Sequence, residues 1–282
     1  MESGNYLEHA VNRCIVELVN HGYPIQSEKW QGIEVGSKPE YLMRDVYNIK
    51  ADFIMGQASE LDQSNLPDYW ARHIKPNLPW ADDHFLERVG GVPLNPGEQY
   101  KNWPFYRRDS EMRNVDEKFT HSYMERYWPK YANTYMPPHA LTFIRPAGHP
   151  GHMGIRYHYG DLQDVINLLQ KQPNTRQAYL PVWFPEDTGA NHGGRVPCTL
   201  GYFFRQRFGY LHVMYFIRSC DALRHFRDDI YLTMRLALWV KDQLAIRDPY
   251  WNTVQLGYLN MVIGSFHCFE GDIRILKDQI GQ

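Results

Sequence analysis

The sequence is short of the features that mark secreted, membrane-spanning or metal-binding proteins. Its four cysteines, Cys14, Cys198, Cys220 and Cys268, form no CxxC pair and no close cluster, which argues against a disulfide framework or a cysteine zinc site. No stretch approaches the ~18 uninterrupted apolar residues of a transmembrane helix. The opening residues, MESGNYLEHA, hold no apolar signal core. We therefore expect reduced thiols, a cytoplasmic location and no membrane contact.

An excess of charge of one sign is also missing. The formal net charge is -2, and no basic tail or run of like charge occurs. Nucleic acid is therefore not an expected partner, because surfaces that bind it need clustered Lys and Arg. Any phosphate contact should come from a few placed arginines. Internal repeats and low-complexity segments are absent too, which excludes solenoids and other repeat folds.

Aromatic residues, in contrast, are abundant: they make up 15% of the chain, with 8 Trp and 20 Tyr. They suit an aromatic-rich core, or platforms on which flat ligands stack. At 282 residues and 43% hydrophobic composition, the chain has enough apolar surface for a large single core. We expect one domain over residues 1–282.

Hydrophobic periodicity predicts the elements of this domain. Helices are predicted over residues 7–21, 39–53, 161–172 and 230–244, and strands over 178–184, 199–204, 211–217 and 256–265. Asp161 suits a helix N-cap, and Phe208-Gly209-Tyr210 suits a turn between two strands. Helices followed by several strands with a buried helix between them predict an α+β fold with a mixed sheet.

Residues 54–118 differ from the rest of the chain. They are rich in Pro, Gly, Trp and charge, and their periodicity is weak. Aromatic side chains such as Trp70, Trp80 and Trp103 give this segment too much to bury for a disordered linker. We expect ordered loops with short helices that cover an active site.

Cys198 is the first candidate for chemistry. It stands in Val196-Pro197-Cys198-Thr199, after a Gly-rich loop over 189–194 and before an apolar strand. A lone cysteine is more often a small buried hydrophobe than a nucleophile. Nearby arginines can lower a thiol pKa, and Arg195, Arg176 and Arg218 are available in the sequence.

Three further blocks follow Cys198. Arg218-Ser219-Cys220-Asp221 ends a strand and suits a bidentate phosphate contact, or a surface ion pair. Asp228-Asp229 opens a helix, where acids either complement the helix dipole or face a ligand. His267, in Gly264-Ser265-Phe266-His267, can bond a sugar hydroxyl or serve the structure alone.

In this order, the blocks resemble the thymidylate synthase superfamily. The resemblance covers about residues 160–275 and implies that Cys198 is the nucleophile. It also implies that Arg176, Arg218, Ser219, Asp221, Asp229 and His267 bind a pyrimidine nucleotide, with Arg176 acting across a homodimer. Tyr123-Met-Glu-Arg-Tyr-Trp128 resembles the family's Tyr-Gly-x-x-x-Trp segment and implies a catalytic role for Tyr123. Glu40-Tyr-Leu-Met-Arg-Asp45 resembles the helix of the catalytic Glu, with Asp45 in its place.

The family's cofactor is 5,10-methylenetetrahydrofolate, for which the resemblance implies Asp221 as a contact. We expect Trp80 to stack on it. Gln177 stands where the family has a second Arg, and Phe269 replaces a Tyr that helps His267 to hold the sugar.

Thr199 and Asp229 resemble the phage deoxycytidylate hydroxymethylase branch, where thymidylate synthases carry His and Asn. A carboxylate accepts the cytosine 4-amino group and a protonated N3, and it repels O4 of uracil. The expected reaction converts dCMP to 5-hydroxymethyl-dCMP. One alternative is a dCMP or dUMP C5-methyltransferase on the same fold. A second is a relative that binds nucleotide without catalysis.

Overall fold

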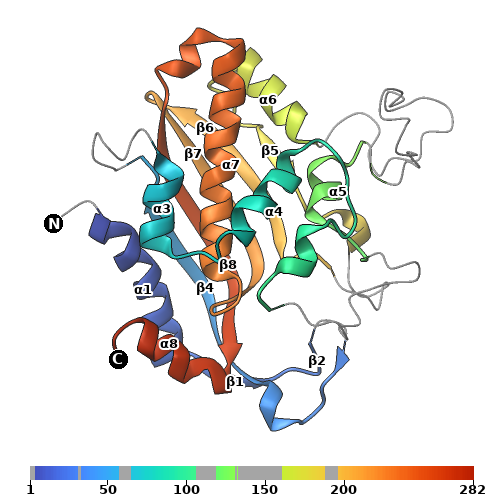
Figure 1. Ribbon diagram of the computed structural model, residues 1–282, viewed down its shortest axis with the longest axis vertical. Helices are drawn as coiled ribbons and strands as arrows, with labels where there is room; N and C mark the ends of the chain where they lie inside the picture. The colour runs from blue at the N-terminus through green and yellow to red at the C-terminus, as the bar shows by residue number, and fades with distance from the viewer. Residues whose placement is uncertain are drawn as a thin grey trace.

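A computed structural model describes residues 4–30, 33–56, 65–105, 119–130, 132, 161–187 and 196–282 (Figure 1). Its α-helices are α1 (Gly4–His21), α3 (Leu66–Ile74), α4 (Trp80–Val89), α5 (Tyr123–Tyr127), α6 (Leu162–Lys171), α7 (Phe226–Arg247) and α8 (Ile273–Gln279). Its strands are β1 (Tyr23–Gln26), β2 (Lys29–Trp30), β3 (Ile33–Glu34), β4 (Leu42–Ile54), β5 (Tyr179–Pro181), β6 (Thr199–Arg207), β7 (Tyr210–Asp221) and β8 (Gln255–Phe269). Short 3-10 helices are η1 (Pro39–Tyr41), η2 (Gln99–Asn102), η5 (Pro185–Asp187), η6 (Pro249–Asn252) and η7 (Glu270–Asp272). Within these ranges, no helix is long and apolar enough to cross a membrane.

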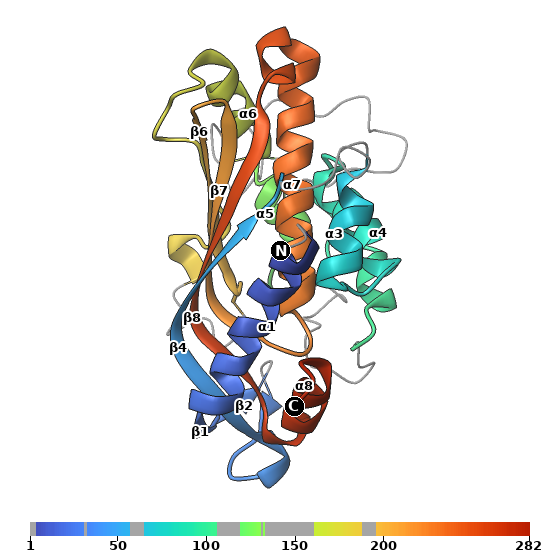
Figure 2. The same cartoon turned by 90° about the vertical axis from the view of Figure 1, so that its left-hand side faces the viewer.

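Six strands form one mixed sheet in the order β1-β4-β8-β7-β6-β5. Neighbouring strands are antiparallel except β7 and β8, which run parallel. Parallel strands need a crossover connection, and α7 supplies it. Figure 2 shows the sheet nearly edge-on, with α1, α7, α3 and α4 on one side. The architecture is α+β, as the sequence predicts.

The core lies between the sheet and these helices. The predicted apolar stripe of α1 is buried, and Val11, Ile15 and Leu18 have no exposed surface. Helix α7 is buried along most of its length, as expected for a helix that connects parallel strands beneath other helices. Its first turn therefore lies deep in the molecule, beside the ends of β6 and β7.

Several local predictions are confirmed. Asp161 caps α6, and its Oδ1 accepts a hydrogen bond of 3.1 Å from the backbone N–H of Asp164. Phe208 and Gly209 connect β6 and β7 with φ angles of 53° and 79°, the left-handed pair that a two-residue hairpin loop requires. Strand β5 is shorter than predicted, whereas β7 and β8 extend further and carry the polar blocks at their ends.

The prediction of a helix over 39–53 is wrong, because residues 42–54 form strand β4. Asn48 adopts a left-handed backbone, with φ 58°, and the buried positions change from Val46 before it to Ala51 and Phe53 after it. This change of face interrupts the two-residue alternation of the strand. The apolar residues then fall at intervals that imitate a helix.

In the segment 54–118, the described residues 65–105 contain α3, α4 and η2, and residues 57–64 and 106–118 lie outside the described part. Trp70 is fully buried, and its indole N–H donates to the carbonyl of Met55 at 2.9 Å. The predicted short helices are therefore present. They pack against α7 and bring one face of α4 toward the start of that helix.

Candidate functional site

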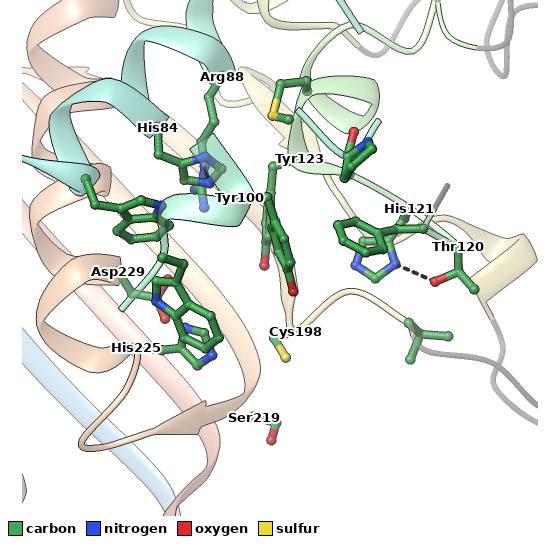
Figure 3. Close-up of a pocket in the computed structure, with 17 residues that line it drawn as sticks. His84, Arg88, Tyr100, Thr120, His121, Tyr123, Cys198, Ser219, His225 and Asp229 are labelled. Carbon is green, nitrogen blue, oxygen red and sulfur yellow. Dashed lines mark hydrogen bonds between the residues drawn. The ribbon is translucent and has the colours of Figure 1, made fainter. Parts of the chain in front are cut away.

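A cleft gathers side chains from distant parts of the chain (Figure 3). Helix α4 and the residues after it contribute aromatic and basic groups, α5 contributes Tyr123, and β6, β7 and α7 contribute Cys198, Ser219 and Asp229. The cleft holds about 910 Å³ of empty space, part of it open to solvent.

Cys198 is the accessible thiol among the four cysteines. It is half-buried at the entry to β6 and lines the cleft, whereas Cys14, Cys220 and Cys268 are buried. Burial raises the pKa of the Cys14 and Cys268 thiols to about 12 and that of Cys220 well above its usual value. Those three remain neutral thiols at physiological pH. Cys198 is therefore the cysteine that can act as a nucleophile.

Arg218 holds the backbone that carries Cys198. The backbone N–H of Arg218 donates to the Cys198 carbonyl at 2.9 Å. In its side chain, Nε donates to the Pro197 carbonyl at 2.8 Å and Nη2 to the Val196 carbonyl at 3.1 Å. The guanidinium carbon also lies 5.7 Å from the Trp183 ring centroid. Two of the side-chain donor groups are thus engaged by backbone, and Nη1 has no hydrogen-bond partner among the described residues.

The other two arginines differ in their placement. Arg176 is exposed and does not line the cleft of its own chain. Arg195 and the predicted Gly-rich loop over 189–194 lie outside the described residues.

The adjacent acids at the start of α7 have different surroundings. Asp228 is buried and accepts two hydrogen bonds from Asn77, of 2.7 Å from its backbone N–H and 2.8 Å from its amide. Asp229 instead lines the cleft, and its Oδ2 lies 3.6 Å from the Cys220 sulfur, which can donate to it. Burial raises the pKa of Asp229 to about 7; Asp228 adds to the rise and Arg88 opposes it. Asp228 therefore anchors α7 to the segment before α4, and Asp229 faces the ligand space.

Three hydroxyl groups connect α5 to the floor of the cleft. The Tyr123 hydroxyl lies 3.0 Å from Thr199 Oγ1, which lies 2.9 Å from the Tyr215 hydroxyl. The Tyr215 ring stacks on Tyr202, with centroids 4.8 Å apart. Burial raises the pKa of Tyr123, so its phenol stays protonated and can donate a hydrogen bond.

Helix α4 contributes the predicted Trp80 and two residues that sequence reasoning missed, His84 and Arg88. Trp80, His84 and Arg88 recur every four residues and face the cleft together. The four-residue spacing of these side chains can be read from the sequence, W-A-D-D-H-F-L-E-R. It indicates a shared face, however, only when residues 80–89 are known to be helical. Arg88 is the only Arg or Lys among the described residues that line the cleft.

Aromatic rings cover the same side of the cleft. Trp80 stacks on His84, with ring centroids 4.9 Å apart, and Trp103 stacks on His225 at 4.7 Å. The Trp80 indole N–H donates to the Gln99 carbonyl at 2.8 Å. The Trp103 Nε1 is buried and has no hydrogen-bond partner among the described residues. The indole N–H of Trp103 is therefore a buried donor without a described partner, whereas that of Trp80 is paired.

Three predicted site residues form a second group, at the ends of neighbouring strands. Asp221 on β7 pairs in register with His267 on β8, which pairs with Asp45 on β4. Asp45 thus lies on a strand and not on the expected helix. None of the three is among the described residues that line the cleft.

The two acids of this second group differ in what they bind. Asp45 Oδ2 accepts a 2.7 Å hydrogen bond from Ser265, while its buried Oδ1 has no partner in the described part of the chain. Burial raises the pKa of Asp45. Asp221 accepts from the backbone N–H groups of Leu223 and Arg224 and forms an ion pair with the Arg224 side chain at 3.1 Å. Its oxygens are therefore already engaged by its own chain.

Comparison with known protein families found none that matches the chain, and a search of curated proteins found no similar sequence. The described residues include no group of three His, Cys, Asp or Glu side chains arranged to hold a metal ion.

Proposed function

We propose that the protein is a thymidylate synthase-like enzyme that transfers a one-carbon unit to C5 of a cytosine nucleotide, converting dCMP to 5-hydroxymethyl-dCMP. The observation that carries this proposal is the meeting of Cys198, Ser219 and Asp229 in one cleft. These residues come from three motif blocks on separate elements. With an accessible thiol and a carboxylate in one cleft, the thiol can attack a nucleotide base while the carboxylate binds the edge of that base; the hydroxyl is a further hydrogen-bonding group.

Cys198 would activate the base. C5 of cytosine is a poor nucleophile, but addition of a thiolate at C6 turns C5 into an enamine carbon that can attack an electrophile. N3 gains a proton as the C6–S bond forms. After C5 has attacked the methylene carbon of the folate, loss of the C5 proton would expel tetrahydrofolate and leave an exocyclic methylene group, to which water would add. Release of the thiolate from C6, with loss of the N3 proton, would then restore the C5–C6 double bond. The hydrogen bonds from Arg218 to residues 196–198 support this role, because they hold the nucleophile's backbone in place.

Asp229 would select the base. An ionised carboxylate only accepts hydrogen bonds, which matches the 4-amino group and protonated N3 of cytosine. The hydrogen bonds from Asn77 to Asp228 support this assignment. They give Asp228 a structural role, the anchoring of α7, and so leave Asp229 as the acid that can contact the base.

5,10-Methylenetetrahydrofolate would supply the one-carbon unit. The aromatic side of the cleft suits a flat heteroaromatic group, since Trp80, Tyr100 and Trp103 line it. Asp221, expected to bind the cofactor, faces Arg224 instead. We therefore assign the stacking role to Trp103 together with Trp80.

A homodimer would complete the phosphate site. Arg176 is exposed and away from the cleft of its own chain, as a residue that serves a partner must be. Strands of the sheet also carry exposed tyrosines, including Tyr47 and Tyr258, which suit burial against a second copy. The molar mass in solution, measured by light scattering, tests this part of the proposal.

Product mass tests the reaction. Purified protein is incubated with CMP, dCMP or dUMP and methylenetetrahydrofolate, and each product is examined by mass spectrometry. Hydroxymethylated dCMP is expected, whereas a methylated nucleotide would assign the chain to the related methyltransferases. The Cys198→Ala variant is the control and should form no product.

A second assay separates an inactive nucleotide-binding relative from an enzyme. The nucleotide 5-fluoro-dCMP carries no proton at C5 to lose, so it should remain covalently bound to Cys198 in the presence of the folate. Absence of both product and adduct, with nucleotide binding retained, would overturn the proposed reaction.

A further inference from the structure

Arg88 is a buried cation: the residue is 5% exposed, and no carboxylate among the described residues lies within ion-pair distance of its side chain. Its Nε donates to His84 Nε2 at 3.0 Å, and its guanidinium carbon lies 4.2 Å from the centroid of the Tyr123 ring. Burying a charge without a paired acid is costly, so the site retains Arg88 at the expense of stability.

His84 is adapted to hold this cation. Burial, together with the charge of Arg88, lowers the pKa of His84 to about 4. The imidazole is therefore neutral, and Nε2 is free to accept from the guanidinium. His84 and Tyr123 thus orient Arg88 without neutralising it, and its positive charge acts on the cleft.

The charge of Arg88 opposes the rise in pKa of both acids at the start of α7, and of these two it is Asp229 that lines the cleft with Arg88, from the opposing element. The other titratable groups around Asp229 are Asp228 and His225 on α7, Cys220 and Tyr215 on β7, Cys198 before β6 and Tyr123 on α5. None of these is a permanent cation. Figure 3 shows the Arg88 side chain extending from α4 toward the region between His84 and Asp229.

We propose that Arg88 is a positioning residue that keeps the Asp229 carboxylate ionised and thereby sets the base specificity of the cleft. This inference rests on the proposed function, in which Asp229 reads a pyrimidine. It adds that specificity depends on the charge of Asp229 as well as on its presence.

The chemistry of the two protonation states explains the effect. Ionised Asp229 accepts two hydrogen bonds and matches cytosine whose N3 becomes protonated when the thiolate adds at C6. Protonated Asp229 has one donor and one acceptor, as an Asn amide has, and it matches O4 and N3–H of uracil. A site that loses Arg88 would hold Asp229 protonated at neutral pH and should accept uracil.

The experiment compares Arg88→Met, which removes the charge, with Arg88→Lys, which retains it. Arg235→Met is the matched control, because Arg235 also packs over an aromatic ring, Phe85, between α4 and α7 but does not line the cleft. The ratio of kcat/KM for dCMP and dUMP is measured from about pH 6 to about pH 8.5, because N3 of cytosine gains its proton only as C6 is attacked. The ionisation of Asp229 is followed in parallel, by the chemical shifts of labelled aspartate carboxyls.

In the wild type, we expect the dCMP preference to grow as pH rises through the titration of Asp229. In Arg88→Met, the titration and the growth of the preference should both move upward by about one pH unit, which lowers the preference near pH 7 by about tenfold. Arg88→Lys should restore much of it, and Arg235→Met should leave it unchanged.

Two results would overturn the inference and leave the proposed function standing: an Asp229 titration that does not move in Arg88→Met, or one that moves without any change in preference. A wild-type protein that turns over neither nucleotide would instead overturn the proposed function, and the specificity role with it. The carboxyl titration would still report whether the two side chains interact.

Discussion

The hydroxyl groups of Tyr123 and Thr199 lie 3.0 Å apart and join helix α5 to the residue that follows Cys198. Helix α5 is only five residues long, too short to be stable without such tertiary contacts. Thr199 also contacts the Tyr215 hydroxyl. One small side chain thus fixes two buried phenols beside the proposed nucleophile.

Replacing this side chain with an apolar one of similar shape should weaken the fold. Thr199→Val leaves two buried phenols without their shared partner, and the free energy of unfolding should fall by about 1–3 kcal/mol. Urea titration measures it. Tyr123→Phe, which removes one phenol and leaves Thr199 bonded to Tyr215, should cost less. Equal stability of Thr199→Val and wild type would show that the three hydroxyls are not coupled.

Asp229→Asn should reverse the preference from cytosine to uracil, because an amide donates to O4 where a carboxylate repels it. Sites built around buried hydrogen bonds can reject the wrong partner by roughly 10⁴-fold, so the ratio of kcat/KM for the two nucleotides should change by orders of magnitude. Asp228→Asn is the control: it removes a neighbouring charge but not the base contact, so it should not reverse the preference. A wild-type enzyme that already prefers dUMP would contradict the assignment.

The raised pKa of Asp229 also predicts that the free energy of unfolding depends on pH. Its folded pKa, about 7, lies above that of a free aspartate, so the native state binds the proton more tightly than the unfolded chain does. Stability from this group is therefore present at acidic pH and is lost as pH rises toward 7, by on the order of 1–4 kcal/mol. Thermal or urea unfolding of wild type and Asp229→Asn across this range isolates the contribution. A constant difference between the two would refute it.

Arg176→Ala should weaken nucleotide binding with little effect on folding. Its side chain is exposed in one chain, so its loss leaves the core intact. Loss of a charged contact to phosphate costs ~2–5 kcal/mol, or tens to thousands of fold in affinity. Calorimetry with the nucleotide and with the matching nucleoside separates the phosphate contribution. If both bind the variant as they bind the wild type, Arg176 has no part in the site.

Asp45→Asn tests whether this acid acts as a base on water. The amide keeps an acceptor for Ser265 but cannot take up a proton, so turnover should fall by about 10²–10⁴-fold. The covalent complex of Cys198 with 5-fluoro-dCMP should still form, because it does not need that step. Unchanged turnover would leave Asp45 a structural residue of the β4–β8 pair.

The sequence predicts the fold best where a local pattern, such as one hydrophobic period, continues through a whole helix or strand. The stripe of α1, the Asp161 cap and the Phe208-Gly209 turn are local patterns, and each is confirmed. Strand β4 was predicted as a helix because Asn48 switches the buried face within it, and that switch depends on pairing with β8. Long-range pairing is not encoded in local periodicity.

The site was predictable in part for the same reason. Cys198, Ser219 and Asp229 stand in recognisable blocks, and the structure brings them to one cleft. Arg88 and Trp103 belong to a segment with weak periodicity, so their approach to Cys198 follows only from the packing of α4 on α7. Asp221 could not be excluded from the cleft by sequence, since its partner Arg224 is merely one of several nearby arginines.

The hydrogen bond between Asp45 and Ser265 joins positions 220 residues apart in the sequence. Strand β4 therefore cannot pair with β8 until almost the whole chain has been synthesised. Until then the exposed edges of β4 and β7 are open to pairing with other chains. Such non-local contacts slow folding and prolong exposure to aggregation. Recombinant yield should accordingly respond more to growth temperature and chaperone supply than to substitutions in the cleft.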